Sequence, residues 1–183
     1  AHSVAAAEGG ALGSLPCAML SAEKAREQVK LVRQRVTAPI NMNFFCHKAV
    51  EADPKREAGW RTRLGGYYKE FDLDPTAPIN AANRAPFDAA MCDVVEELKP
   101  EVVSFHFGLP EPALLKRVKA TGAIIVGCAT IVREAVWLEE NGVDCSWRYS
   151  AFSVRVVFGV ISPLSASAKP AVSLVLNLMN ESW

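Results

Sequence analysis

The hydrophobic positions of this chain follow two different spacings. Five apolar residues recur at i, i+3, i+7, i+10 and i+14, which places them on one face of a helix: Ala22, Ala25, Val29, Val32 and Val36. Shorter segments, at 102–107 and 123–129, are apolar almost throughout and have the length of strands. Strands that are apolar on both faces and alternate with amphipathic helices predict a parallel sheet covered by helices.

The pattern predicts the following elements in chain order. Helices are expected at 2–8, 21–36, 87–98, 111–120 and 132–140, and strands at 11–15, 39–45, 102–107 and 123–129, with another opening at Val143. Ser21 is a suitable N-cap, and Gly9 and Gly10 end the first helix. The polar segment 51–84 is interpreted as an inserted loop with short helices. A barrel and an open doubly wound sheet both fit this order, and periodicity does not choose between them.

Charge and cysteine usage limit the class of protein. The 183 residues carry 20 basic and 20 acidic side chains, so neither nucleic acid nor an anionic membrane is expected as a partner. No apolar run has the length of a membrane-spanning helix, and no signal peptide is visible. The five cysteines are widely spaced without a C-x-x-C pair, which favours a reducing cytoplasm. Cys46 and His47 are adjacent and point to opposite faces of a strand, so no metal site is expected.

The composition changes after Asp144. Residues 1–144 contain four Ser, whereas 145–183 contain eight, and Glu181 is the only acidic residue of this tail. A strand is expected within 154–161, while 170–179 is apolar without helical spacing. We therefore divide the chain into a domain segment, 1–144, and a divergent tail, 145–183. Our hypothesis is that the tail is out of register with its ancestor, through a frameshift or an alternative exon.

Polar residues at predicted strand ends are the candidate functional residues. Asn41 and Asn43 alternate with apolar neighbours, and an amide at a strand end either binds a ligand or caps the next element. His106 ends a strand before the Gly-x-Pro turn at 108–110. An imidazole there would lie at the rim of a barrel, where it donates a hydrogen bond to an anion or accepts a proton. The alternative is a hydrogen-bonded histidine of the core.

Two further segments carry weaker signals. Gly9 to Ser14 is glycine-rich, but it follows a helix and precedes a strand, which is the wrong context for a dinucleotide fingerprint. A tight helix-to-strand turn is the simpler interpretation. The segment can be such a turn and also contact a cofactor if the end of the strand abuts a flat cofactor. Cys128 ends a strand as a small, core-type residue, and Thr130 is the expected N-cap of the following helix. Trp60, Tyr67 and Tyr68 either cover a ligand or anchor their loop.

Several of these segments resemble bacterial nitronate monooxygenases, also called 2-nitropropane dioxygenases. The similar segments are Gly9 to Leu15, Asn41 to His47, Val103 to Pro110, Cys128 to Ala135 and Asn141 to Asp144. The resemblance implies an FMN-bound (β/α)8 TIM barrel that oxidises alkyl nitronates, such as propionate 3-nitronate, with O2 to a carbonyl compound and nitrite. By this resemblance Asn43 contacts FMN and His106 lies in the active-site pocket. Gly10 and Cys128 are counted as further cofactor contacts.

The sequence departs from the family pattern at both ends. The family's first strand would precede residue 1, and its Gly-Gly-His-Arg-Gly loop does not follow Asp144. The expected fold class is therefore α/β, a partial (β/α)8 TIM barrel that lacks the first strand and the C-terminal part. The expected function is nitronate oxidation. The alternatives are a related FMN barrel enzyme, such as a flavin-dependent enoyl reductase, and an inactive truncated remnant. We expect the chain to bind FMN weakly or not at all.

Overall fold

The computed structural model describes residues 2–48, 53–77, 85–148 and 157–159. The chain divides into two compact units, one made of Ala1–His47 and Arg84–Trp183 and the other of Lys48–Asn83. The first unit contains the sheet and the candidate residues Gly10, Asn43, His106 and Cys128. The second contains the helices of the predicted insertion.

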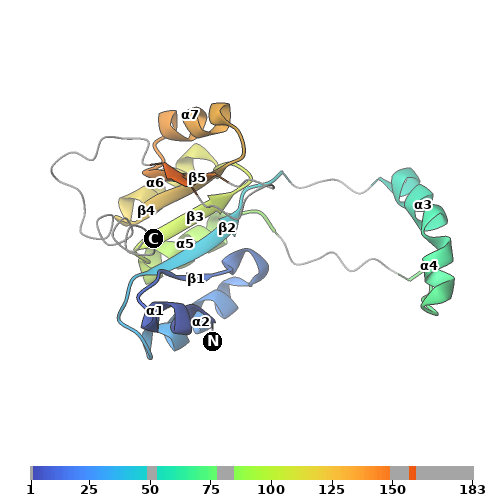
Figure 1. Ribbon diagram of the computed structural model, residues 1–183, viewed down its shortest axis with the longest axis horizontal. Coiled ribbons are helices and arrows are strands. Elements are labelled where there is room, and N and C mark those ends of the chain that lie inside the picture. The colour runs from blue at the N-terminus through green and yellow to red at the C-terminus, as the bar shows by residue number, and fades with distance from the viewer. Residues whose placement is uncertain (1, 49–52, 78–84, 149–156, 160–183) are drawn as a thin grey trace. The chain divides into compact units, whose positions relative to one another are not determined.

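The sheet of the first unit has its strands in sequential order (Figure 1). The strands are β1 Gly13–Leu15, β2 Ile40–Phe45, β3 Val102–His106, β4 Ile124–Ala129, β5 Cys145–Arg148 and β6 Val157–Gly159. The first five are parallel, and β6 runs antiparallel to β5. A doubly wound sheet reverses its strand order, whereas right-handed crossovers between sequential neighbours keep all helices on one side and curve the sheet. The fold is therefore the α/β arc of a partial β/α barrel.

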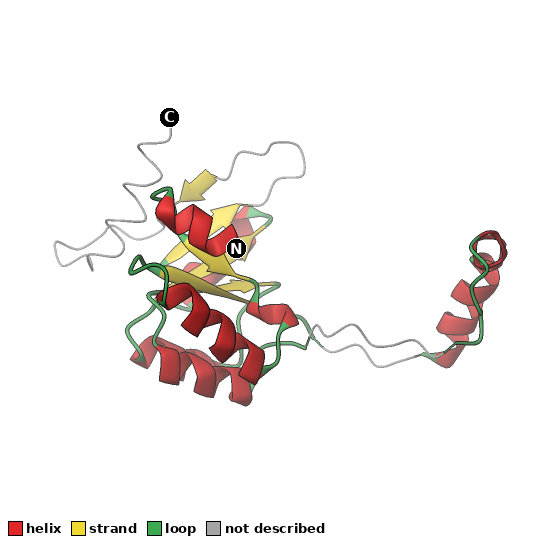
Figure 2. Ribbon diagram, turned by 90° about the horizontal axis from the view of Figure 1, so that it is seen from below, coloured by secondary structure: helices red, strands yellow, loops and turns green. Residues whose placement is uncertain are grey.

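The helices of this unit pack on one face of the sheet. They are α1 His2–Glu8, α2 Ala22–Arg33, α5 Ala89–Leu98, α6 Pro112–Ala120 and α7 Val132–Glu140, with a short 3₁₀ turn at Cys17–Met19 (Figure 2). One apolar core joins residues of α2, α5, α6 and α7 to alternate residues of β1 to β4. The helical spacing of Ala25, Val29 and Val32 thus gives the buried stripe that the sequence predicts.

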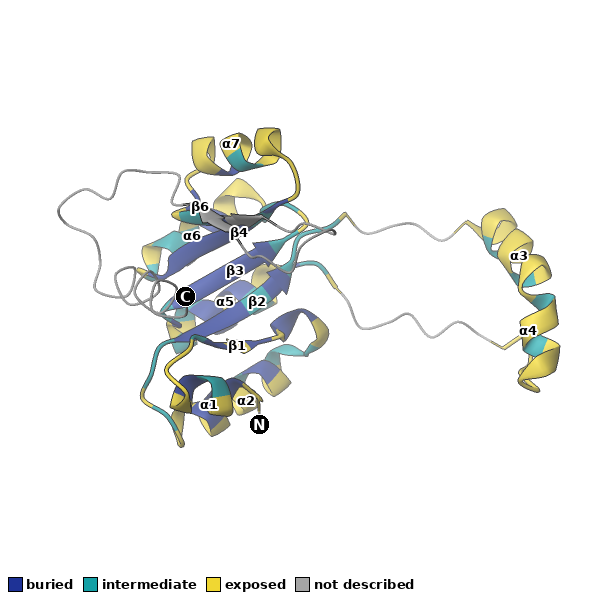
Figure 3. Ribbon diagram, in the orientation of Figure 1, coloured by how far each residue is buried: buried dark blue, intermediate teal, exposed yellow. Residues whose placement is uncertain are grey.

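The strands are buried on both faces, and alternate residues point to opposite sides of the sheet. Ile40, Met42 and Phe44 of β2 point into the helix-covered core, as do Val103 and Phe105 of β3. The middle strands are accordingly the most buried part of the molecule (Figure 3). The ring of Phe87 packs edge-on against Phe44 and Phe105, at centroid distances of 4.8 and 5.3 Å. Phe87 thus contributes to the core just before α5 begins.

Side-chain caps account for the starts of α2 and α5, and two expectations are corrected. Ser21 accepts a hydrogen bond from the Lys24 amide at 3.3 Å, which confirms it as an N-cap. Asp88 caps α5 in the same way, so this helix begins at Ala89 and not at Phe87. Thr130 is not the N-cap of α7, because Ile131 holds that position. The carboxylate of Glu134 reaches back instead and accepts hydrogen bonds from the Thr130 amide and hydroxyl.

The second unit consists of two short helices, α3 Pro54–Arg63 and α4 Gly65–Glu70, as the sequence predicts for the insertion. Asp53 caps α3, and Arg61 binds the carbonyl oxygens of Pro75 and Ala77. The segment forms a compact unit of its own, which goes beyond the loop that the pattern suggests. Trp60 and Tyr67 are exposed. Their role as a cover over a ligand stays a prediction.

The start of the tail continues the sheet. The expected strand begins at Cys145, two residues after Val143, and pairs in parallel with β4. Asp144 aligns it, because its amide donates to the Ile125 carbonyl oxygen and its carboxylate accepts from the Ile125 amide. Within the expected strand 154–161, β6 covers Val157–Gly159. The rest of that segment and residues 170–179 lie outside the described residues, and the register hypothesis stays a prediction.

In the described ranges, no helix is both long enough and apolar enough to cross a bilayer.

Candidate functional site

A row of hydrogen-bonded polar side chains crosses the face of the sheet opposite the helices. The Asn41 side-chain amide donates to the hydroxyl oxygens of Ser14 on β1 and Ser104 on β3, both at 2.9 Å. Asn43 donates to the same Ser104 oxygen at 2.8 Å. Because Asn43 and Ser104 are register partners, adjacent strands bring these groups together. We call Ser14, Asn41, Asn43 and Ser104 the polar ladder.

The polar ladder contains one unmatched acceptor. Asn41 is buried, and its Oδ1 is the only fully buried side-chain oxygen or nitrogen in the described ranges that has no hydrogen-bond partner. A buried carbonyl oxygen without a donor is costly, and such groups are normally satisfied by an ordered water or a ligand. This part of the sheet therefore offers an acceptor to a donor from outside the described residues.

The same face of the sheet changes character along the strands. Near the amino ends it is apolar, with a small cluster formed by Val102, Ile124 and Val126. At the carboxyl ends it carries Asn43 on β2, His106 on β3 and Cys128 on β4. In β/α barrels the reacting groups lie at this carboxyl edge. The structure thus brings three of the four predicted site residues to one rim.

His106 lies within a group of aromatic rings at the rim. The centroids of Phe45 and Phe107 lie 6.2 and 6.1 Å from its imidazole, and Phe45 also contacts His47. Burial lowers the pKa of His106 below its ordinary value, since desolvation penalises the charged form. The imidazole is therefore neutral at pH 7, with one N–H to donate and one nitrogen to accept a proton.

A cavity of 680 Å³ opens beside His106. Its lining comprises His106, Phe107, Gly108, Cys128, Thr130, Glu134, Trp137 and Leu138. Glu134 is the anionic group of this lining, and its hydrogen bonds to Thr130 lower the pKa of the carboxyl. The cavity therefore combines an imidazole, a fixed carboxylate and apolar walls, and its volume suits a small organic molecule.

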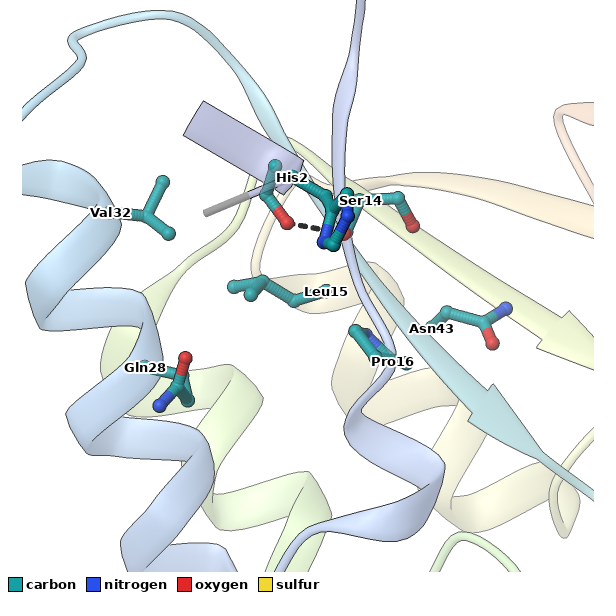
Figure 4. Close-up of a pocket in the computed structure, with 8 residues that line it drawn as sticks. His2, Ser14, Leu15, Pro16, Gln28, Val32 and Asn43 are labelled. Atoms are coloured by element: carbon teal, nitrogen blue, oxygen red, sulfur yellow. Dashed lines mark hydrogen bonds between the residues drawn. The ribbon is translucent and has the colours of Figure 1, made fainter. Parts of the chain in front are cut away.

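A second cavity, of 440 Å³, lies at the edge strand β1 (Figure 4). Asn43, Ser14, Leu15 and Pro16 line it from the strands and the turn after β1, and α2 contributes Gln28 and Val32. The Nδ2 of Asn43 is held by Ser104. Its Oδ1 is then the atom that the amide can offer to a ligand as an acceptor.

Gly10 lies away from these groups. It follows α1 with a left-handed backbone, φ 84°, and its amide donates to the Ala7 carbonyl oxygen at 3.1 Å. This is the helix-ending role of glycine. Since the segment leads into β1, Gly10 lies at the amino edge of the sheet, opposite the rim with His106. Its contact with a cofactor stays a prediction that the geometry does not support.

Three cysteines outside the cavity linings have raised pKa values. Burial raises the pKa of Cys17 and Cys46 to about 12, so both are protonated thiols at neutral pH. Burial also raises the pKa of Cys145. None of these three thiols lines the cavity beside His106.

Ser104 and Glu134 are two residues of the site that the sequence pattern does not single out. Ser104 holds both amides of the ladder, and it stands two positions before His106, which puts the two on the same face of β3. A serine inside an otherwise apolar strand was the available signal. Glu134 gives no such signal in the sequence, because an acidic residue in the first turn of a helix is ordinary.

Comparison with known proteins places this rim in a family. A sequence model of nitronate monooxygenases matches residues 2–146. This chain belongs to the nitronate monooxygenase family. The nitronate monooxygenase of Pseudomonas aeruginosa is 35% identical to it over 147 residues, which are 79% of this chain and 41% of that protein. The nitronate monooxygenase of Paraburkholderia phytofirmans is 34% identical over 145 residues, 79% of this chain and 40% of the relative.

A solved structure supports the barrel fold. Nitroalkane oxidase from Streptomyces ansochromogenes superposes with a TM-score of 0.64 and 24% identity, over 79% of this chain and 40% of that one. The arc of parallel strands is therefore part of a TIM barrel, as expected. The chain spans about two fifths of the length of the curated relatives that it matches, with 40% and 41% of their residues covered.

The side chains at the rim of this nitronate monooxygenase family member suit one part of FMN better than the other. A flavin ring presents a planar edge of donors and acceptors, and the Asn43 amide beside the orphaned Asn41 Oδ1 suits such an edge. The phosphate needs cations or a nest of backbone amides. In the described part of the chain, neither cavity is lined by Lys or Arg. The described residues that line the two cavities thus fit the ring of the cofactor and provide no Lys or Arg for its phosphate.

Proposed function

We propose that these strands form part of the active site of a nitronate monooxygenase, in which an alkyl nitronate is oxidised beside FMN with O2. The observation that carries the proposal is the position of Asn43, His106 and Cys128 toward the carboxyl ends of three adjacent parallel strands. His106 and Cys128 line the cavity of 680 Å³, and Asn43 lines the cavity of 440 Å³. FMN, with its ring edge at Asn43, would supply one-electron transfer between the nitronate and O2. The products are a carbonyl compound and nitrite.

The side chains of this chain supply binding and orientation. The neutral imidazole of His106 donates its N–H to the anionic nitronate, which holds the reacting carbon in place and disperses charge. Phe107, Trp137 and Leu138 supply apolar surface around that hydrogen bond. Asn43, fixed by Ser104, offers its carbonyl oxygen to the flavin edge. The proposed partners are small molecules, a nitronate and O2. The proposed compartment is the reducing cytoplasm.

The first experiment tests the cofactor. The chain is purified, desalted and titrated with FMN by flavin fluorescence. We expect weak binding without stoichiometric retention, because neither described cavity lining offers a Lys or Arg to the phosphate. A yellow protein that keeps one FMN per chain after desalting contradicts this expectation.

The second experiment tests the reaction. Residues 2–146 replace the matched segment of the Pseudomonas aeruginosa relative, and nitrite release from alkyl nitronates is measured with FMN in excess. We expect turnover, and we expect His106→Asn to lower kcat/KM by about 10²-fold or more, the scale of a lost acid–base or anion-stabilising group. If the variant binds FMN and keeps its kcat/KM, His106 is a structural residue. Reduction of an enoyl substrate without nitrite release would assign a related flavin reductase instead.

A further inference from the structure

Phe107 has an unusual backbone conformation at the centre of the rim. It follows the last residue of β3 with φ 65°, and Gly108 follows with φ 105°. A left-handed backbone is uncommon for a residue other than Gly, Asn or Asp, and for a bulky side chain it is unfavourable. Glycine would occupy both positions without this cost. The conformation therefore needs an explanation beyond the turn itself.

The left-handed turn moves the Phe107 ring to the side of His106. Along a regular strand, Phe107 would follow Phe105 toward the helix-covered core. Instead the rings of Phe107 and His106 lie 6.1 Å apart, and both line the cavity of 680 Å³. Edge-on contacts with Phe45 at 5.1 Å and His47 at 6.3 Å hold the ring there. Two consecutive side chains thus face one cavity.

This placement gains no burial for the ring. Phe107 is 65% exposed, whereas Phe105, two residues earlier, is fully buried. Strained residues that persist at a site without a stabilising role are candidates for function. An exposed aromatic wall beside an anion-binding group is suited to hold the apolar part of an anionic ligand.

The rest of the cavity gives the ligand an orientation. Glu134 is held at the start of α7 by Thr130 and carries a negative charge. It repels an anionic head group, which is left to the imidazole of His106. Phe107, with Trp137 and Leu138 of α7, provides apolar surface for what remains of the ligand.

We propose that Phe107 is a specificity-determining residue, the wall on which the alkyl chain of the nitronate packs. The inference rests on the proposed function and adds to it the selection of substrate by chain length. Each methylene that packs on the ring leaves water, so affinity rises with chain length in the wild type. Without the ring, this dependence is lost while the charged head binds as before.

The test is calorimetric titration of the full chain with ethyl, butyl and hexyl nitronate, without oxygen. In the wild type we expect the affinity to rise about threefold to fourfold per methylene. Phe107→Ala is expected to reduce this to less than about 1.5-fold per methylene and to change the affinity for ethyl nitronate less than about twofold. Phe107→Leu, which keeps apolar bulk, is expected to restore most of the dependence. Leu31→Ala, an exposed apolar residue on α2 outside both cavities, is the matched control and keeps it.

The outcomes separate this inference from the proposed function. A wild type without chain-length dependence overturns the inference, as does an equal loss at all chain lengths in Phe107→Ala. Nitrite release with an unaltered dependence in Phe107→Ala overturns it and leaves the proposed function standing. Chain-length selection that requires Phe107, without any nitrite release, supports it and removes the proposed function. Phe107→Gly, which accepts the left-handed backbone freely, carries the same test if Phe107→Ala does not fold.

Discussion

The two faces of the sheet use alternate residues of the same strands for different purposes. On the helix side, Phe44, Val103 and Phe105 are apolar and fully or almost fully buried. On the opposite side, Asn43, Ser104 and His106 are polar and hydrogen-bond or line cavities. One face therefore holds the fold together and the other carries its chemistry. A single-residue shift of register would exchange the two roles, which is why each strand needs both patterns.

Side-chain loss on the two faces of the sheet lowers stability for two different reasons. Losing a core side chain leaves a cavity that the helices cannot fill, and the cost grows with the volume removed. Losing a ladder side chain leaves a buried donor or acceptor without a partner, and the cost is that of desolvation. The predictions below compare these costs, beginning with the larger.

Phe105→Ala is expected to have the largest effect on stability. The side chain is fully buried between Phe44 and Phe87, so its removal should lower the free energy of unfolding by about 3–5 kcal/mol. Urea unfolding followed by circular dichroism measures the change. Phe107→Ala is the matched control, because that ring is exposed and its loss should cost less than about 1 kcal/mol. Equal losses in the two variants would remove the distinction between the faces.

Ser104→Ala is expected to cost less, about 1–2 kcal/mol in the same unfolding measurement. The change removes the shared acceptor of Asn41 and Asn43, and only Asn41 keeps a second acceptor, in Ser14. Ser14→Ala removes one part-buried hydrogen bond and leaves Asn41 its bond to Ser104, so it should cost under half as much. A Ser104→Ala protein as stable as the wild type would show that the ladder contributes no stability.

The smallest effect concerns the pH dependence of His106. Burial lowers its pKa in the folded chain below the ordinary value of 6.5, so the unfolded chain binds the proton first as the pH falls. The contribution of neutral His106 to stability is therefore fully present above pH 6.5, the ordinary pKa. It is lost as the pH falls below 6.5 toward the lower pKa of the folded chain. His106→Gln should reduce this loss between about pH 5 and 6.5 and have little pH-dependent effect above about pH 7.5. Thermal unfolding midpoints of both proteins across this range provide the measurement, and parallel profiles would contradict the assigned burial.

Local patterns sufficed for the elements and for part of the site. The spacing of Val29 and Val32 predicted a helix because a helix repeats every 3.6 residues, and the cap at Ser21 followed from its hydroxyl. His106 was found because it ends an apolar strand. The start of α5 was misplaced because Phe87 belongs to the core without being helical, a fact that depends on Phe44 and Phe105 from distant segments.

The sequence by itself determined the alternation of helix and strand, the buried stripe of each helix and the polar residues at strand ends. These properties arise from the periodicity of neighbouring residues. Only the tertiary structure decided that the strands follow one another in order, since pairing between segments far apart leaves no local trace. It also decided that Ser104 joins two asparagines and that the left-handed turn brings Phe107 beside His106. Register and a single backbone angle determine these contacts, and neither is visible in the hydrophobic pattern.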